Sequence, residues 1–377
     1  MRQTAIPVIP KSGNRAEIDR IEKLYVEVTN RCNLTCRTCM RNSWEESSGD
    51  MAFQLFKRIV DQFEALSEDA TLFIGGIGEP LSHPDILDMI RYAKDRTGRV
   101  EMISNGILLT ADMAAGLIDA GLDCLWVSID GARPEHYADI RLGNHLPEIL
   151  ENLKTWRDLS SQLLTRSVEL GISFVAMKRN IGDLAEIVDL AETLGARHFS
   201  ISHVEPYTEA LYSEMLYQDR VNEKIPASGT ELPRNDNGMI PPDLLERIRK
   251  SFQMPFPRRM PKESACPFFL RKSISVRWDG QVSPCLPLLH GHDVNLKFLE
   301  RTWAAHSIGS LDQHPLEQIW MDKANREFRK TQEEFSFAPC LTCYSCDLPS
   351  LNGEDCFGNA HPACGGCLWA QGFIICP

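Results

Sequence analysis

Six short apolar segments alternate with amphipathic segments through the first 205 residues, and this alternation constrains the fold more than any other feature. The segments expected to be strands are Leu24–Thr29, Thr71–Gly75, Val100–Ser104, Cys124–Asp130, Val168–Met177 and Arg197–His203. The segments expected to be helices are Ala52–Leu66, Pro84–Arg96, Ala111–Ala120, Pro147–Ser161 and Asp183–Leu194. Such regular alternation is typical of an α/β fold in which crossover helices join parallel strands.

The ends of the expected strands carry glycine and polar residues, which helps to distinguish between two folds. Doubly wound sheets and barrels both alternate strands with helices. Functional residues that follow several different strands are typical of the carboxyl-terminal mouth of a (β/α) barrel. We therefore predict a partial (β/α)6 TIM-type barrel over residues 1–205.

The second part of the chain lacks this alternation. Residues 206–265 are rich in turn-forming residues, and we expect a linker or lid there. Residues 266–377 are predicted to form a small cysteine-rich domain with little regular structure. Within it, Asp279-Gly280 lies between two β-rich segments, and this dipeptide predicts a tight hairpin.

The charge balance limits the kinds of partner. The 377 residues include 40 basic and 52 acidic side chains, which gives a net charge of −12. Such a chain is poorly suited to nucleic acid, whose phosphates require Lys and Arg. No apolar segment is long enough to span a bilayer, and the amino-terminal segment is too short and proline-broken to be a signal peptide. We therefore expect a cytoplasmic protein without a nucleic-acid or membrane partner.

The distribution of the 13 cysteines indicates metal binding. Ten of them fall in two dense regions, 32–39 and 340–376, and Cys266 and Cys285 lie between these regions. A reducing cytoplasm does not sustain a disulfide scaffold, so dense cysteine favours metal ligation. Cys124 stands apart in an apolar segment and is expected to be a buried core residue.

The first cysteine region has the spacing C-x3-C-x2-C directly after the first expected strand, with thiols at Cys32, Cys36 and Cys39. A [4Fe–4S] cluster ordinarily takes four thiolates, so three leave one iron free to bind a chelating substrate. A structural zinc ion requires four closed ligands, and no fourth is near in the sequence. The spacing therefore favours a cluster with an open iron.

This triplet resembles the signature of radical SAM enzymes, which use S-adenosylmethionine (SAM). One position differs, because Thr38 replaces the aromatic residue that often precedes the last cysteine. The resemblance implies that Cys32, Cys36 and Cys39 hold a [4Fe–4S] cluster that reductively cleaves SAM. It also implies that the resulting 5′-deoxyadenosyl radical abstracts hydrogen from a substrate.

Four further segments at expected strand ends resemble SAM-binding motifs of the same family, although each alone is equally consistent with a turn. GGIGEP, from Gly75, is similar to the glycine-rich motif that holds the methionyl amine, with extra residues relative to GGEP. SNG, VSIDG and MKRN are similar to the family's T-N-G, V-S-x-D-G and M-x-x-N. The resemblance covers residues 23–205 and implies as SAM-binding residues Gly75, Gly76, Gly78, Glu79, Pro80, Ser104, Asn105, Ser128, Asp130 and Asn180.

Nine cysteines from position 266 onward suffice for two more [4Fe–4S] clusters and leave one over. On the residues alone, zinc ribbons remain an open alternative, since C-x2-C pairs are typical of them. The spacing C-x13-G-x4-C with a late cysteine cluster resembles the SPASM domain, which adds auxiliary clusters to radical SAM enzymes. The expected ligands are Cys266, Cys285, Cys340, Cys343, Cys346, Cys356, Cys364, Cys367 and Cys376.

The late spacings differ from the usual SPASM pattern, so the assignment of single cysteines to clusters stays open. We expect Cys266 and Cys285 to share one cluster, and Cys340 and Cys343 to help hold the other. A ligand at Cys376, the penultimate residue, would tether a chain end that otherwise frays.

The end of the chain, which includes GGCLWAQG, resembles radical SAM maturases associated with tungsten-containing aldehyde oxidoreductases. This resemblance implies a role in maturing the tungstopterin cofactor or its oxidoreductase, with a reductant such as ferredoxin or flavodoxin. Two alternatives stay open: a SPASM enzyme acting on a ribosomal peptide or a small alcohol, and a non-enzymatic zinc-binding scaffold. Glu205 and Tyr207, after the sixth expected strand, are candidates for substrate contact or proton transfer.

Overall fold

The fold was analysed in a computed structural model of the chain. It describes residues 20–67, 70–162, 168–218, 221, 240–254, 266–296, 299–341, 343, 346–360 and 362–377. The expected linker at 206–265 therefore lies partly outside the described residues.

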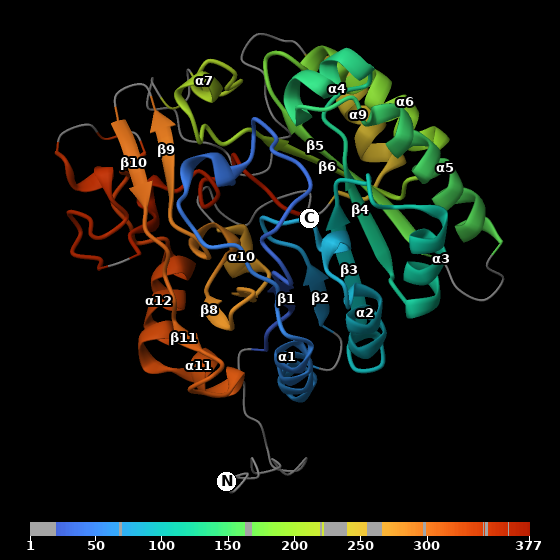
Figure 1. Cartoon of the computed structure of the whole chain (residues 1–377). Coiled ribbons are helices and arrows are strands. Elements are labelled where there is room, and N and C mark those ends of the chain that lie inside the picture. The colour runs from blue at the N-terminus through green and yellow to red at the C-terminus, as the bar shows by residue number, and fades with distance from the viewer. Residues whose placement is uncertain are drawn as a thin grey trace, which may run out of the picture.

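A nine-stranded sheet forms the centre of the molecule (Figure 1). Its order is β11-β8-β7-β1-β2-β3-β4-β5-β6, and β1 to β6 are all parallel. These six strands are β1 Lys23–Val26, β2 Thr71–Ile74, β3 Arg99–Ser104, β4 Cys124–Ser128, β5 Glu169–Ala176 and β6 His198–His203. They confirm the six expected strands and the partial barrel.

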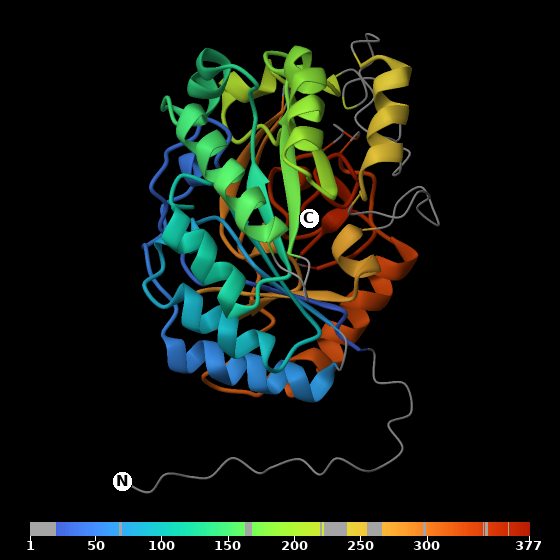
Figure 2. The same ribbon diagram turned by 90° about the vertical axis from the view of Figure 1, so that its right-hand side faces the viewer.

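Helices cover the outer face of these strands, as Figures 1 and 2 show. They are α1 Phe53–Leu66, α2 Ile86–Lys94, α3 Ala111–Ala120, α4 Pro134–Arg141, α5 Leu146–Ser161 and α6 Leu184–Thr193. In α1, Phe56, Ile59, Val60 and Phe63 are fully buried at the spacing that places them on one helix face. The sequence analysis missed α4, because only Tyr137 and Ile140 of its eight residues are buried.

The cysteine-rich part extends the same sheet. Strand β7 (Ser273–Val276) pairs in parallel with β1, and β8 (Gln281–Ser283) pairs antiparallel with β7. The turn between them confirms the expected hairpin at Asp279-Gly280, where Gly280 has a φ of +86° that favours glycine. Strand β11 (Gly309–Ser310) completes this edge of the sheet.

The second half contains more regular structure than expected. A separate antiparallel pair consists of β9 (His292–Leu296) and β10 (Leu299–Trp303). The helices are α7 Glu209–Tyr212, α9 Pro242–Ser251, α10 Pro267–Leu270, α11 Leu316–Met321 and α12 Lys323–Glu334. Helix α12 was missed because its buried residues, Asn325 and Gln332, are polar and give no apolar periodicity. No helix in the described ranges combines the length and apolarity needed to cross a membrane.

The carboxyl terminus lies inside the molecule (Figures 1 and 2). On one side, the amide of Ile375 donates to Ser202 Oγ on β6 at 3.0 Å. On the other, the Tyr25 hydroxyl on β1 donates to the carbonyl oxygen of Pro377 at 3.1 Å. The Arg271 guanidinium donates to the same oxygen, also at 3.1 Å. The last residues therefore bridge the first and last strands of the barrel.

A buried ion pair joins the barrel to the second half. His290 Nε2 lies 2.9 Å from both carboxylate oxygens of Glu27, and both side chains are fully buried. Burial alone would lower the pKa of His290, but the hydrogen bond and charge of Glu27 raise it. His290 Nδ1 also lies 3.1 Å from Glu46. Glu27 therefore depends on a partner from a distant part of the sequence.

We expect a chain that ends at residue 254 to be insoluble. The truncation leaves one edge of β1 unpaired and Glu27 buried without His290, and both changes favour aggregation or misfolding. Expression of this fragment beside the full chain, followed by gel filtration and iron analysis, checks the expectation. A soluble monomer that binds about four irons would contradict it.

Candidate active site

A cavity of about 280 Å³ lies at the carboxyl ends of the parallel strands. Residues from loops after β1 and β2, and from β3 to β6, all line it, which is possible because the sheet curves around it. The predicted site residues on its wall are Cys32, Cys36, Cys39, Gly76, Gly78, Glu79, Ser104, Asn105, Ser128, Glu205, Tyr207 and Cys376. The structure thus brings together residues up to 344 positions apart, Cys32 and Cys376.

The loop that carries the first three cysteines is shaped by the residues before it. Thr29 donates to Asp50 at 2.6 Å, and Asn30 exchanges hydrogen bonds with Ser47 and Gly49. Burial raises the pKa of the Cys32 thiol, and raises that of Cys39 to about 11. A positively charged metal group would favour the thiolate forms of Cys32 and Cys39, and the all-sulfur donor set of this loop suits iron.

The glycine-rich segment after β2 packs directly against the cysteine loop. A Cβ on Gly78 would lie 2.2 Å from the carbonyl oxygen of Thr29, and the Glu79 amide donates to the Arg31 carbonyl at 2.7 Å. A Cβ on Gly76 would lie 2.8 Å from the side chain of Glu27. Only glycine permits this approach, so the backbone of this segment is fixed relative to the thiols.

Glu79 presents its carboxylate within this wall. It accepts from Ser104 Oγ at 2.9 Å and from the Asn105 and Leu81 amides at 2.7 and 3.1 Å. Burial raises its pKa against these hydrogen bonds. A buried carboxylate held by uncharged donors is well suited to receive a cationic amine.

Four predicted SAM-binding residues lie behind the cavity wall. Gly75 and Pro80 are the first and last residues of the glycine-rich segment, and neither lines the cavity. Asp130 and Asn180 are buried and do not line it either. Asn180 donates to the carbonyls of Asp130 and Val175 at 2.9 and 2.8 Å, which ties the ends of β4 and β5 together. In the structure these residues hold the wall in place.

Arg141, which the sequence analysis missed, does reach the cavity. It forms a buried ion pair with Asp130, and its Nη1 lies 3.7 Å from the Cys36 sulfur. Asp130 in turn accepts from the Val175 amide at 2.9 Å. One feature of the sequence could have indicated a residue such as Arg141. Asp130 follows a buried strand, and a buried aspartate requires a cationic partner.

Glu205 and Tyr207 face the same cavity after β6. Glu205 accepts from the Tyr207 hydroxyl at 2.8 Å and from the Trp369 indole at 2.6 Å. Burial raises its pKa from 4.5 to about 7, against these two hydrogen bonds. Glu205 can therefore hold or release a proton near neutral pH.

The later cysteines fall into two sets. Cys266, Cys285, Cys364 and Cys367 line one cleft, and we call them set A. The pKa of Cys285 is raised well above the ordinary value, mainly by burial. The negative charges of the other three thiols raise it further. Cys343 and Cys356 act on Cys340 in the same way. We call these three thiols set B, and we propose the exposed Cys346 as its fourth member.

Cys376 packs against the apolar cluster that contains Cys266, but no thiol of either set is among the groups that act electrostatically on it. The charged groups that act on it are Lys23, Arg271 and Glu101, near the start of the barrel strands, and burial raises its pKa to about 11. Hydrogen bonds already hold the chain end, as described above for Tyr25, Arg271 and Ser202.

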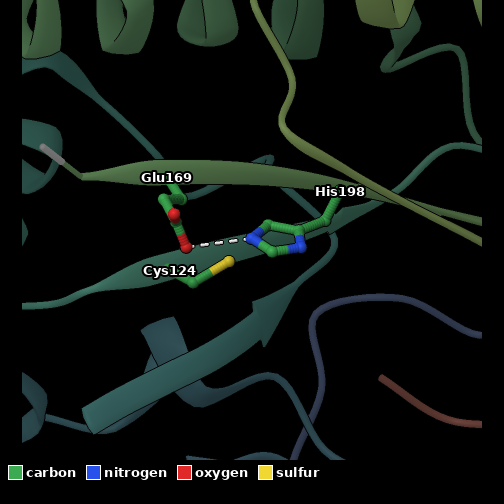
Figure 3. Close-up of side chains that lie close together, drawn as sticks. All are labelled: Cys124, Glu169 and His198. Atoms are coloured by element: carbon green, nitrogen blue, oxygen red, sulfur yellow. Dashed lines mark hydrogen bonds and ion pairs between the residues drawn. The ribbon is translucent and has the colours of Figure 1, made fainter. Parts of the chain in front are cut away.

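One further group of ligand-type side chains meets within 4.8 Å: Cys124, Glu169 and His198 (Figure 3). Glu169 already accepts from His198 at 2.9 Å and pairs with Arg197 at 2.9 Å and with Arg99. These cations neutralise the carboxylate and would repel a metal ion, so we interpret the group as an ion-pair cluster. Cys124 is fully buried, as expected.

In the described part of the chain, no three thiols of set A or set B approach within 4.8 Å of one another. Four Zn–S bonds of 2.3 Å in a tetrahedron place sulfur atoms about 3.8 Å apart. In the described residues, neither set therefore has the spacing of a closed tetrahedral zinc site.

Comparisons with known proteins agree with this site. Residues 26–191 match the family model of the Radical SAM superfamily, and residues 266–347 match the SPASM model, described as an iron-sulfur cluster-binding domain. The chain is 29% identical over 359 residues to the tungsten-containing aldehyde ferredoxin oxidoreductase cofactor-modifying protein of Pyrococcus furiosus. That alignment covers 94% of this chain and 96% of the relative.

A second relative is a probable GTP 3′,8-cyclase of Methanocaldococcus jannaschii, 28% identical over 74% of this chain and 93% of its own. Among solved structures, SuiB of Streptococcus suis bound to S-adenosylmethionine superposes with a TM-score of 0.60 at 15% identity, covering 86% of this chain and 70% of that chain. The anSMEcpe structure with bound AdoMet gives 0.58 at 14% identity, covering 87% and 88%. At these identities the solved structures confirm the fold alone.

We expect the substitution Cys376→Ala to leave the iron content unchanged, because no thiol of set A or set B acts electrostatically on Cys376 and hydrogen bonds already hold the chain end. The matched variant Cys364→Ala should lose about four of about 12 irons per chain. Iron analysis after anaerobic reconstitution measures both. Loss of about four irons from Cys376→Ala would identify it as a ligand.

The raised pKa of Glu205 predicts a stability that falls as pH rises. Between pH 4.5 and about 7 the folded chain keeps a proton on Glu205 that the unfolded chain has lost. The free energy of unfolding therefore decreases through this window, and the full decrease is reached above about pH 7. The shift corresponds to about 3 kcal/mol. Glu205→Gln should therefore gain stability relative to the wild type between pH 5 and pH 8.

Anaerobic thermal unfolding of Glu205→Gln at pH 5 and pH 8, at one scan rate, measures this difference. Tyr207→Phe is the control, because it keeps the carboxylate and removes a hydrogen bond that lowers its pKa, so its stability should fall with pH at least as steeply as that of the wild type. Equal pH dependence in the wild type and Glu205→Gln would refute a raised pKa.

Proposed function

Because the chain belongs to the radical SAM superfamily and carries a SPASM iron–sulfur domain, we propose that it modifies the cofactor of a tungsten-containing oxidoreductase. One observation carries the proposal: the segment that resembles tungsten maturases forms part of the cavity wall. Trp369, Ile374, Ile375 and Cys376 from this segment line the cavity together with Cys32 and its neighbours.

The cofactors of this enzyme are a [4Fe–4S] cluster with an open iron, SAM and auxiliary iron–sulfur clusters. We propose Cys32, Cys36 and Cys39 as ligands of the first cluster, and sets A and B as ligands of two auxiliary clusters. When bound, the first cluster and SAM supply a 5′-deoxyadenosyl radical that abstracts hydrogen from an unreactive carbon.

The polar residues of the wall have distinct proposed roles in holding SAM. Glu79 receives the methionyl amine, because its buried carboxylate is braced by Ser104 and Asn105. Arg141 presents a guanidinium beside Cys36 that can pair with the methionyl carboxylate. Ser128, at the end of β4, contributes a hydroxyl to the same wall.

Glu205 is the proposed proton acceptor or donor for the substrate. Its pKa of about 7 allows both protonation states at neutral pH, and Tyr207 and Trp369 orient the carboxylate. Tungstopterin carries ring N–H groups, which such a carboxylate can bind or deprotonate.

The proposed domain boundaries are 1–205 for the barrel, 206–265 for the linker or lid and 266–377 for the auxiliary-cluster domain. The two matched ranges, 26–191 and 266–347, lie within the first and third of these. We propose that a ferredoxin or flavodoxin reduces the enzyme, and that the oxidoreductase or its free cofactor is the substrate partner.

The test is SAM cleavage by the anaerobically reconstituted enzyme with a chemical reductant. We expect 5′-deoxyadenosine to form faster when tungstopterin, released from an oxidoreductase, is present. Cys36→Ala should lose about four irons and all cleavage. Mass spectrometry of 5′-deoxyadenosine and of the recovered pterin checks both the radical step and the product.

The substrate assignment would be overturned by cleavage that tungstopterin leaves unchanged and that a peptide or a small alcohol stimulates. The absence of any cleavage by reduced, cluster-loaded enzyme would overturn the radical chemistry itself. A matched control is Cys124→Ala, because that buried thiol lies outside the cavity and outside both cysteine sets.

A further inference from the structure

A second cleft, of about 320 Å³, lies in the cysteine-rich half, beside the SAM cavity. The four thiols of set A line it, among aromatic side chains that include Phe268 and Trp320. Helix α12 forms its rim. The cleft therefore connects the proposed auxiliary cluster of set A with the molecular surface.

The rim of this cleft is positively charged. It carries Lys272, Arg326, Arg329 and Lys330 against a single carboxylate, Glu333. Arg326 and Lys330 are exposed and lie one helical turn apart, on the same face of α12. The chain has a net charge of −12, so the positive charge of this rim is opposite in sign to that of the protein as a whole.

The other two rim cations have structural contacts. Arg329 stacks on the Trp320 ring at 3.9 Å and donates to its carbonyl at 2.8 Å. Lys272 lies 3.5 Å from Glu22. Arg326 and Lys330 are therefore the cations whose substitution disturbs the fold least.

Set A is close to the SAM cavity as well as to the surface. Trp369 and Pro287 line both the cleft and the cavity, so these two residues form a shared wall. The Trp369 indole donates to Glu205 on the cavity side. An electron that arrives at set A thus has one layer of side chains between it and the SAM site.

We propose that the rim of α12 is the docking surface for an acidic one-electron carrier of the ferredoxin class, which delivers its electron to the cluster held by set A. The inference rests on the proposed function, since it requires that cluster. In the step, the reduced carrier loses one electron and the cluster of set A gains it, and no atom is transferred.

Charge complementarity favours this occupant. An acidic carrier is repelled by the net negative charge of the protein and attracted to this basic rim, which steers it to the cleft. Electron-carrier complexes are small and short-lived, so a few cations around an apolar cleft are sufficient.

The experiment measures binding of a reduced bacterial-type ferredoxin to the holoenzyme by titration calorimetry at low salt. Arg326→Glu combined with Lys330→Glu should weaken binding about tenfold or more, and Gln at both positions should have an intermediate effect. The wild-type affinity should also fall as salt rises, more steeply than that of the Glu double variant.

The matched control is Arg249→Glu with Lys250→Glu on α9, which makes the same charge change on a helix at the right of Figure 1, whereas α12 lies at its left. Its ferredoxin affinity should stay near that of the wild type. Equal affinity in the α12 double variant and the wild type would overturn the proposal, as would equal loss in the α9 control.

A second measurement separates docking from chemistry. SAM cleavage driven by ferredoxin should slow in the α12 double variant, whereas cleavage driven by reduced methyl viologen should not, because this small cation needs no docking surface. An equal loss with both reductants would mean a structural effect and would overturn docking. No cleavage by wild type with viologen would refute the proposed function, while the affinity data would still decide the docking surface.

Discussion

The buried carboxylate of Glu27 connects the three parts of the molecule that form the site. It stands at the end of β1, accepts from the Ile77 amide in the glycine-rich segment at 3.3 Å and pairs with His290 in the second half. A fully buried carboxylate is strongly destabilising unless it is paired, so the barrel folds stably only when His290 is in place. The glycine-rich segment then takes its position from the same carboxylate. SAM binding in the first half is in this way coupled to the folding of the second.

The end of the chain is the second element on which the site depends. It passes the cavity between β6 and β1, and Trp369 fixes Glu205 before the chain reaches Arg271 and Tyr25. In the described residues seven parallel strands, β7 and β1 to β6, form an open sheet, and the tail is hydrogen-bonded to both β6 and β1. The segment that carries the family resemblance is therefore part of the cavity wall and of the core.

Much of the fold was predictable because the barrel strands are buried on both faces and their helices are amphipathic. The three cysteines and Glu79 were predictable because they follow strands, where parallel topology gathers them. The pairing of β7 with β1 was not predictable, since partners about 250 residues apart leave no local signal. Arg141 and His290 were missed for the same reason, because their importance comes from partners, Asp130 and Glu27, that are distant in sequence.

The start of the barrel strands is closed by charge rather than by apolar packing. Lys23 lies 3.6 Å from Glu101, and burial lowers its pKa to about 8. Arg99 pairs with Glu101 at 2.6 Å and with Glu169. Such a network excludes bulk water only when every member is paired, because one unpaired ion would draw water into the barrel. A radical formed at the opposite end needs a dry cavity. The ion pairs at the strand starts thus serve the chemistry at the strand ends, although none of their side chains lines the proposed SAM cavity.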